Sequence, residues 1–350
     1  MLVAVCMALA AHAINLIRVE AGNSESLLAA IEEANKLNAD STAEATFILI
    51  PNGTYDLGDR VLTKISGHNI ALVGQSTMNT VIHNAPDVAN EGIRTTAILL
   101  NTGTNNYLQD LTLHNGLKYY EAGNAGRAVC LQDKGTRTIC NRVLMLSYQD
   151  TYYSDNELCE HYMLDSEIHG TVDFICGAGD VWFEHCTIVT EPRTVEGKGR
   201  CVVAAPRTSK TQWGYVFNRC TVQSISQSFE YARGWHTTPR CVWLHTRLLN
   251  PNRLSQTRFD HHGMRTVQSF FKEYATTDAA GKDITPESNI VTLDYKEERN
   301  QIETIFTEKE ASLYTVRRIF PKWRPDRVLQ KREQQAAQAW KKYPTSASLH

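Results

Sequence analysis

The sequence predicts an all-β protein: a right-handed parallel β-helix with an N-terminal capping helix and a peripheral C-terminal helix. Most of the chain consists of short runs of β-forming residues broken by Gly, Asn and Asp, and one kind of run recurs along it. The size agrees with this, because 350 residues of which 42% are hydrophobic and 21% charged can bury a large core.

The recurring run places a polar pair before alternating residues. Its copies lie at 107–115, 139–146, 163–168, 182–188, 216–222 and 242–248. The apolar alternation ends at 113, 146, 168, 188, 222 and 248, which gives steps of 33, 22, 20, 34 and 26 residues. A period of about 20 residues with insertions is typical of a solenoid whose stacked coils share one interior. A β-sandwich is the alternative, but the Asn-Gly or Asp-Gly hairpins that it predicts are scarce here.

Two helices are expected outside the coils. Residues 24–37 place apolar side chains at helical spacing behind Ser24, a capping residue, and we expect this helix to cover the open end of the first coil. Residues 326–342 follow Pro325 and are rich in helix formers, which predicts the peripheral C-terminal helix.

The N-terminal residues predict export. Residues 2–13 are apolar apart from His12 and end in Ala-His-Ala, a pattern typical of a signal peptidase site, with a buried strand as the alternative. We therefore expect a signal remnant at 1–13, one β-helix domain over 14–322 and a helical tail over 323–350, in a periplasmic or secreted protein. No other stretch approaches the about 20 apolar residues of a membrane-spanning helix.

The charges and cysteines exclude some classes of partner and site. With 36 basic and 38 acidic residues the net charge is −2, which disfavours a nucleic-acid partner. No two of the nine cysteines have the C-x-x-C spacing of a zinc or redox site. Cys186 and Cys220 share one slot of the repeat, which indicates buried thiols that pack inside the coils. If a disulfide exists, Cys130 and Cys140 are the most plausible pair.

Two aspartates follow neighbouring coils. Asp150 and Asp173 are 23 residues apart, close to the 22-residue step between those coils, and stacked strands lie about 4.8 Å apart. Two carboxylates this close have split pKa values, one a poised acid and the other an anion, as ester cleavage by a carboxylate nucleophile requires. The alternative is that both aspartates only cap turn amides.

Three phrases at these positions resemble the pectin methylesterases (pectinesterases), most closely those of gut-type Gram-negative bacteria. They are Gln149-Asp150-Thr151 with Tyr153, Gly170-Thr171-Val172-Asp173-Phe174-Ile175 with Gly177, and Arg233-Gly234-Trp235, where the family usually has Arg-Pro-Trp. The resemblance runs from about residue 15 to about residue 275. The family fold is a right-handed parallel β-helix, in agreement with the repeats.

The resemblance implies a mechanism and a substrate. Asp173 is expected to attack the C6 methyl ester of a galacturonate residue in methyl-esterified pectin (homogalacturonan), and Asp150 to act as acid and then base. Arg233 is expected to orient Asp173, and the Gln149 amide to donate to the oxyanion. The side chains implied to face the sugar rings are Tyr153, Phe174 and Trp235. The resemblance implies no metal or organic cofactor, and we expect a monomer.

One departure from the family and two rival functions stay open. Arg127 stands where the family often has a second oxyanion glutamine, and we hypothesise that it binds substrate charge, with donation to the oxyanion as the alternative. Another pectin-active β-helix enzyme, a polygalacturonase or a lyase, is the first rival, although neither the extra aspartate pairs nor a calcium-binding carboxylate cluster is visible. A non-catalytic carbohydrate-binding β-helix is the second.

Overall fold

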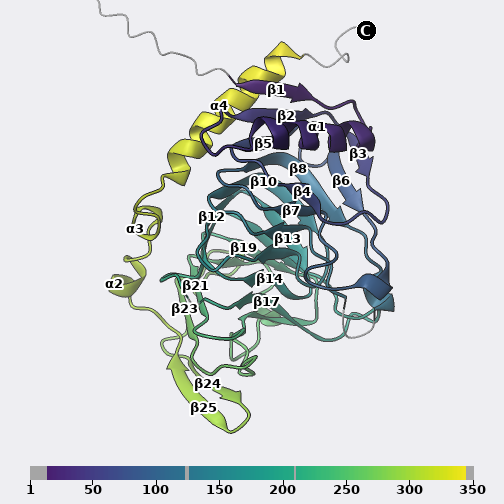
Figure 1. The fold of residues 1–350 in the computed structure, drawn as a ribbon. Coiled ribbons are helices and arrows are strands. Elements are labelled where there is room, and N and C mark those ends of the chain that lie inside the picture. Colours follow the sequence, from purple (N-terminus) through teal and green to yellow (C-terminus); the bar gives the residue numbers. More distant parts are fainter. Residues whose placement is uncertain (1–13, 123–125, 209, 344–350) are drawn as a thin grey trace, which may run out of the picture.

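Parallel strands stacked into coils form the body of the protein (Figure 1), which the computed structural model describes over residues 14–122, 126–208 and 210–343. The main path of the long sheet contains β1 (Asn15–Arg18), β2 (Thr46–Ile50), β5 (Ile70–Gly74), β8 (Tyr107–Asn115), β10 (Thr138–Leu146), β12 (Glu160–Leu164), β15 (Asp180–Glu184), β18 (Tyr215–Asn218), β21 (Arg240–Leu244) and β23 (Phe270–Tyr274). Joined to this path are β3 (Gly53–Asp56), β6 (Thr80–Asn84), β13 (Glu167–Gly170), β16 (Thr187–Thr190), β19 (Thr221–Ser224) and β22 (Arg247–Leu248).

A second, short sheet faces the long one across the interior. It contains β4 (Thr63–Ile65), β7 (Leu99–Asn101), β9 (Leu131–Asp133), β11 (Tyr152–Ser154), β14 (Val172–Gly177), β17 (Arg200–Pro206) and β20 (Ser228–Ala232). Strand pairs in both sheets are parallel, and only the separate hairpin of β24 (Ile290–Tyr295) and β25 (Glu298–Glu303) is antiparallel among the named strand pairs. The predicted parallel β-helix is therefore confirmed, and the β-sandwich alternative is wrong.

The polar pair in each repeat marks a corner of the coil. Asp110, Arg142 and Arg219 end their pairs, and each has a left-handed backbone with φ of 53°. A residue in this conformation turns the chain sharply between two strands, and polar side chains tolerate the resulting exposure better than apolar ones. The repeated phrase is thus strand, corner, strand, and the corners stack along the molecule.

Identical slots of successive coils stack inside the β-helix. Phe183 lies 4.4 Å from Phe217, and Phe217 lies 3.9 Å from Trp243, ring centre to ring centre and nearly parallel. The register Thr187↔Thr221 puts the preceding residues, Cys186 and Cys220, in equivalent positions, as predicted. Such ladders bury large apolar area at each step, which is the main stabilising contribution in a solenoid.

The eight described cysteines are free and buried, so the expectation of packed thiols is confirmed. The pairing of Cys130 with Cys140 is wrong. Cys130 directly precedes β9 of the short sheet, whereas Cys140 lies in β10 of the long sheet, and the Cys130 thiol instead donates to the carbonyl oxygens of Leu113 and Leu146.

The N-terminal helix α1 (Ser24–Leu37) lies across the first coil, as predicted (Figure 1). Leu27, Ile31 and Ala34 are buried against the interior, so the helix closes the end of the core. The N-cap is Asn23 rather than Ser24, because the Asn23 side chain accepts a hydrogen bond from the Ser26 amide at 3.0 Å.

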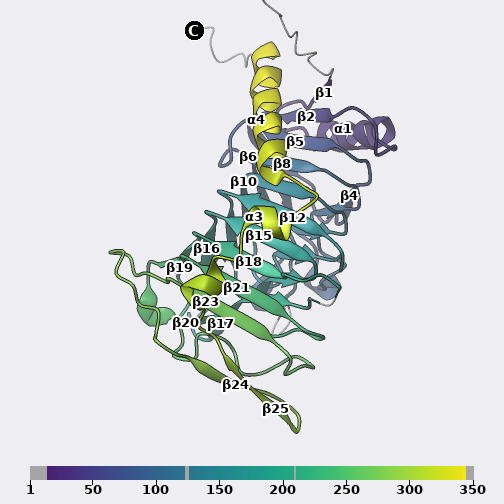
Figure 2. The same ribbon diagram turned by 90° about the vertical axis from the view of Figure 1, so that its left-hand side faces the viewer.

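The chain from residue 305 to 343, called here the C-terminal segment, returns along the outer face of the long sheet (Figures 1 and 2). It contains α2 (Glu308–Ala311), α3 (Val316–Ile319) and α4 (Pro325–Lys342). Glu333 in α4 accepts hydrogen bonds from Asn141 and Arg142 of β10 at 2.9 and 2.6 Å, so the peripheral C-terminal helix is confirmed and is docked. None of the described helices combines the length and hydropathy needed to cross a membrane.

The predicted signal at residues 1–13 lies outside the described residues. The division into a domain at 14–322 and a tail at 323–350 stays a prediction.

Candidate active site

A pocket of about 190 Å³ opens on the outer face of the short sheet. Cys176 of β14 and Ala205 of β17 belong to the buried cluster beneath it. The pocket is lined by Ile93, Arg127, Gln149, Asp150, Asp173, Cys176, Ala205, Arg233, Trp235 and Met264. Six of the eight site residues predicted from the sequence are therefore brought together in one pocket.

The coil register sets the two aspartates side by side. Tyr152 of β11 pairs with Ile175 of β14, and Asp150 and Asp173 lie two residues before these partners. Both aspartates have left-handed backbones, with φ of 60° and 52°. Aspartate tolerates this conformation better than most residues do. Asp150 is 4% exposed and Asp173 is 6% exposed, so both acidic groups border the pocket while being almost fully buried.

Arg233 holds Asp173 at two points. Its Nε and Nη2 atoms donate to the two carboxylate oxygens of Asp173 at 2.7 and 2.5 Å. Arg233 follows β20, two strands beyond β14 in the short sheet, so it spans the surface of β17. A bidentate, charge-assisted pair fixes the plane of the Asp173 carboxylate.

Asp150 has no comparable cation. The nearest is Arg127, whose Nε is 3.9 Å from Asp150 Oδ2, and the Cys176 thiol also contacts the carboxyl group. Burial, and next the negative charge of Asp173, raise the pKa of Asp150 well above its usual range, while Arg127 and Arg233 oppose the shift. The pair therefore consists of an Asp150 whose pKa is raised beside an arginine-bound Asp173, the asymmetry that the two-carboxylate hypothesis requires.

Arg127 is already paired. Its Nη1 lies 3.0 Å from both carboxylate oxygens of Glu91, and its backbone is bridged to that of Gln149. Glu91 neutralises much of its charge, so the geometry gives less support to direct binding of a substrate anion than the sequence suggested. Its closest approach within the site is to Asp150.

Gln149 and Trp235 border the pocket as predicted. Gln149 directly precedes Asp150 and is partly exposed, so its amide remains available to a bound group. The Trp235 ring is also partly exposed, and the Arg207 guanidinium lies 5.2 Å from its ring centre.

Two predicted substrate-facing rings do not face the pocket. Phe174 is fully buried in the central core, because β14 shifts register between Val172 and Ile175 and turns this ring inward. Its Cβ lies where a side chain on Gly170 would be, which explains the glycine. Tyr153 is on the outward face but only 1% exposed, with its ring centre 6.1 Å from that of Trp235. Neither ring lies where the predicted contact with a sugar needs it, and Tyr153 instead packs against Trp235.

Four lining residues were not among the predicted site residues. Met264 pairs with the backbone of Trp235 from the next coil. Ile93, Cys176 and Ala205 carry no chemical signal in the sequence beyond their small or apolar side chains.

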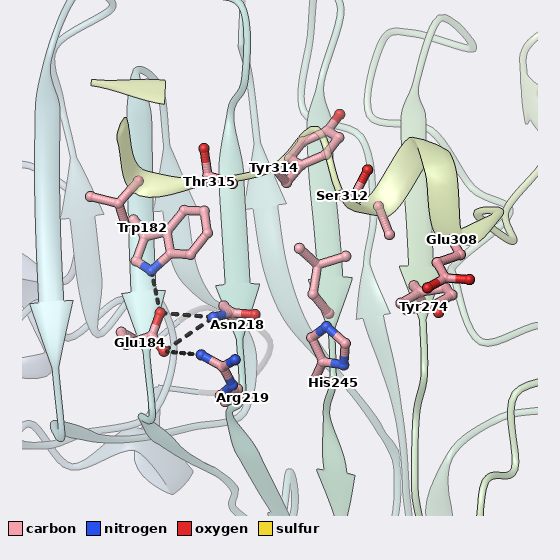
Figure 3. A pocket seen from close by; sticks show the side chains of 13 residues that line it. Trp182, Glu184, Asn218, Arg219, His245, Tyr274, Glu308, Ser312, Tyr314 and Thr315 are labelled. Atoms are coloured by element: carbon pink, nitrogen blue, oxygen red, sulfur yellow. Dashed lines mark hydrogen bonds and ion pairs between the residues drawn. The ribbon is translucent and has the colours of Figure 1, made fainter. Parts of the chain in front are cut away.

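A larger pocket, of about 440 Å³, lies between the outer face of the long sheet and the C-terminal segment (Figure 3). Trp182 and Glu184 of β15, Asn218 of β18 and His245 line one side, and Tyr314 lies opposite. It contains neither of the paired aspartates.

The chain was compared with known proteins. The family model described as Pectinesterase matches residues 17–317. A probable pectinesterase of Arabidopsis thaliana is 26% identical over 226 residues, which are 63% of this chain and 60% of the relative. A probable pectinesterase A of Aspergillus oryzae is 27% identical over 217 residues, 59% of this chain and 63% of the relative. The chain thus spans less than two thirds of the length of these curated relatives.

Solved structures share the fold. A pectin methylesterase from Erwinia chrysanthemi superimposes with a TM-score of 0.68 at 22% identity, covering 89% of this chain and 98% of its own. The pectin methylesterase from carrot superimposes with a TM-score of 0.66 at 20% identity, covering 83% of this chain and 88% of its own. A pectin methylesterase from Yersinia enterocolitica superimposes with a TM-score of 0.65 at 21% identity, covering 84% of this chain and 98% of its own.

Proposed function

Because the chain belongs to the pectinesterase family, we propose that it removes methyl esters from C6 of galacturonate residues in pectin and releases methanol. The observation that carries the proposal is the asymmetry of the aspartate pair: Arg233 binds both oxygens of Asp173, whereas burial raises the pKa of Asp150. A nucleophile and an acid are thereby adjacent in one pocket.

In the first half-reaction an Asp173 oxygen attacks the ester carbonyl carbon. The Gln149 amide donates to the developing oxyanion, a type of contribution worth about 3 kcal/mol. As the bond from the carbonyl carbon to the methoxy oxygen breaks, Asp150 gives its proton to that oxygen and methanol departs. The uronyl group is then bound to Asp173 as an acid anhydride.

In the second half-reaction water replaces methanol. Asp150, now ionised, accepts a proton from the water that attacks the uronyl carbonyl carbon, and the bond to Asp173 breaks. The polymer leaves with a free carboxylate at C6 of that residue, whose proton passes to solvent, Asp173 returns to its pairing with Arg233, and Asp150 holds a proton again. The cycle uses only residues of the pocket.

Two residues support contact with a sugar. Trp235 and Met264 present partly exposed apolar surface beside the aspartates, as a ring face of galacturonate requires. A structural neighbour with a TM-score of 0.65 and 22% identity, covering 84% of this chain and 93% of its own, was solved as a pectin methylesterase in complex with a hexasaccharide. We therefore assign methyl-esterified pectin as the polymeric partner of this chain. A monomeric state and export to the periplasm or the medium stay predictions from the sequence.

Arg127 is assigned an electrostatic role. Its guanidinium is paired with Glu91 and lies nearest to Asp150, so it limits how far the pKa of Asp150 rises. This replaces binding of a substrate carboxylate as the better-supported hypothesis for the residue.

The test is methanol release from highly methylated pectin by the wild type and by Asp173→Asn. The wild type should release methanol without shortening the polymer and without forming unsaturated uronate, which separates an esterase from a polygalacturonase or a lyase. Asp173→Asn should lose at least about a thousandfold in turnover. Equal activity in both proteins would refute the proposal, and binding without turnover in the wild type would favour the non-catalytic alternative.

A further inference from the structure

A second cluster of chemically active side chains lies beside the candidate pocket. Asp260, His261 and His262 each direct one ligating atom to a common point, and these three atoms all lie within 4.8 Å of one another. The cluster follows Ala232 and Arg233 by one coil, because the Asp260 amide donates to the Ala232 carbonyl at 3.0 Å. None of the three residues has a role in the esterase chemistry.

The carboxylate of Asp260 is fixed and buried. It is 1% exposed, its Oδ2 accepts a hydrogen bond from Arg200 Nη2 at 3.1 Å, and its Oδ1 accepts one from the His262 amide at 3.0 Å. Arg200 is itself held by Glu230 at 3.0 Å. In metalloproteins, hydrogen-bond partners of this kind orient a carboxylate that binds the metal ion.

Both imidazoles point at the remaining side of Oδ1. Their Nδ1 atoms lie 3.7 Å (His261) and 3.6 Å (His262) from Asp260 Oδ1, and the ring centres are 3.9 Å apart. These distances are too long for hydrogen bonds, and neither ring has another hydrogen-bond partner among the described residues. Both rings are therefore held close to one carboxylate without a hydrogen bond to it. A lone pair on the Nδ1 atom of each neutral imidazole can then bind a cation.

The backbone of the cluster is clamped on both sides. The Asp294 amide donates to the His261 carbonyl at 2.9 Å, and the Gly263 amide donates to the Asp294 carbonyl at 3.0 Å. A Cβ on Gly263 would come within 1.8 Å of the Thr266 carbonyl oxygen, so only glycine fits this turn. The ligand set is therefore pre-organised by β24 and not carried on a loose loop.

The donor set and spacing select the metal. Two imidazoles and one carboxylate suit Zn²⁺, whereas Mg²⁺ and Ca²⁺ prefer oxygen donors. Bond lengths of about 2.0–2.1 Å place two tetrahedral Zn²⁺ ligands about 3.4 Å apart. Adjacent octahedral ligands at those bond lengths lie about 2.9 Å apart. The distances from Asp260 Oδ1 to the two histidine Nδ1 atoms, 3.6 and 3.7 Å, are closer to the tetrahedral value.

We infer that Asp260, His261 and His262 form a Zn²⁺ site whose fourth position is open to water. The site does not depend on the esterase assignment. A bound Zn²⁺ would link the turn before Met264 to Asp260, which is held by the Arg200–Glu230 pair. Met264 lines the candidate pocket, so the ion would also stabilise one wall of that pocket. The buried cysteines of the described residues do not compete for zinc in the folded protein.

The test is calorimetric titration of chelator-treated protein with Zn²⁺, and Co²⁺ absorption as a reporter of geometry. The wild type should bind one equivalent and give the intense visible bands of tetrahedral Co²⁺. His261→Ala and His262→Ala should each weaken binding at least about tenfold. Both side chains are substantially exposed, so these variants should fold, which circular dichroism checks.

His245→Ala is the matched control, because it removes an exposed histidine that has no place in the cluster and should bind zinc as the wild type does. Failure of the wild type to bind, unchanged binding in both cluster variants, an equal loss in the His245→Ala control, or the weak bands of octahedral Co²⁺ would each overturn the proposal. Methanol release is not the readout, so failure here leaves the esterase proposal unaffected.

Discussion

The two pockets on opposite sheets differ in how their acidic groups are satisfied. In the pocket under the C-terminal segment, Glu184 accepts hydrogen bonds from Trp182 Nε1 at 2.6 Å and from Asn218 Nδ2 at 2.8 Å (Figure 3). Its carboxylate also lies 3.0 Å from the His185 ring. In the aspartate pocket, Asp150 is buried beside a second carboxylate, with its nearest cation at 3.9 Å.

This difference matters more than size. The volume of the pocket at Glu184 is about 440 Å³ and that of the pocket at Asp150 about 190 Å³. A carboxylate whose oxygens already accept several hydrogen bonds is nevertheless a weak base and a weak nucleophile. A buried carboxyl group with a raised pKa holds a proton that it can transfer. The comparison predicts that chemistry depends on Asp150 and that Glu184 contributes to folding only.

After Asp173→Asn, the largest effect should come from Asp150→Asn. The amide keeps the shape of the side chain but cannot give a proton to methanol or take one from water, so turnover should fall about a thousandfold. Methanol release under saturating pectin measures it, with thermal unfolding to confirm that the variant is folded. A loss of less than about tenfold would remove the acid–base role from Asp150.

The next effect should come from Arg233→Lys. Lysine keeps the positive charge but binds as a point charge and cannot hold both Asp173 oxygens, so turnover should fall about a hundredfold. The same assay measures this, with the Michaelis constant fitted separately. If only the Michaelis constant changed, Arg233 would be a substrate-binding residue and not the one that positions Asp173.

A smaller, pH-dependent effect is expected for Arg127→Leu. Asp150 must be protonated to act as acid, so kcat/KM falls as the pH rises through its raised pKa. Arg127 lowers that pKa, and removing it should raise the pKa further and move the alkaline limb to higher pH. A pH–rate profile of both proteins measures the shift; a limb that moved to lower pH would contradict the assigned role.

The smallest effect on activity should come from Glu184→Gln, the matched change in the other pocket. Turnover should stay within about twofold of the wild type. The free energy of unfolding, measured with urea, should fall by about 2 kcal/mol, because several donors lose a charged acceptor. A loss of activity like that of Asp150→Asn would end the distinction between the two pockets.

Sequence spacing predicted the parts of the site that follow from coil stacking. Asp150 and Asp173 are neighbours because their 23-residue separation equals the offset between β11 and β14. Arg233 acts across an intervening strand, and only the family resemblance pointed to it. Its two-point bond to Asp173 agrees with the role that the resemblance implied.

The errors come from places where regular stacking fails. Phe174 points inward because the register shifts at Asp173, and a strict alternation of faces does not anticipate such an irregularity. Glu91 pairs with Arg127 from a loop 36 residues earlier, and no local pattern records that contact. Tyr153 lies on the expected face, but neighbouring outer side chains, Trp235 among them, cover it.

The central claim is that Asp150 holds a proton beside the arginine-bound Asp173 in the resting protein. Infrared difference spectroscopy of the wild type against Asp150→Asn tests it directly, because a protonated carboxyl group has its own C=O stretching band. We expect a band near neutral pH that is absent from the variant and that disappears only as the pH rises above the usual carboxyl range. An Asp150 signal that is already fully ionised above a pH of about 4 would contradict the account.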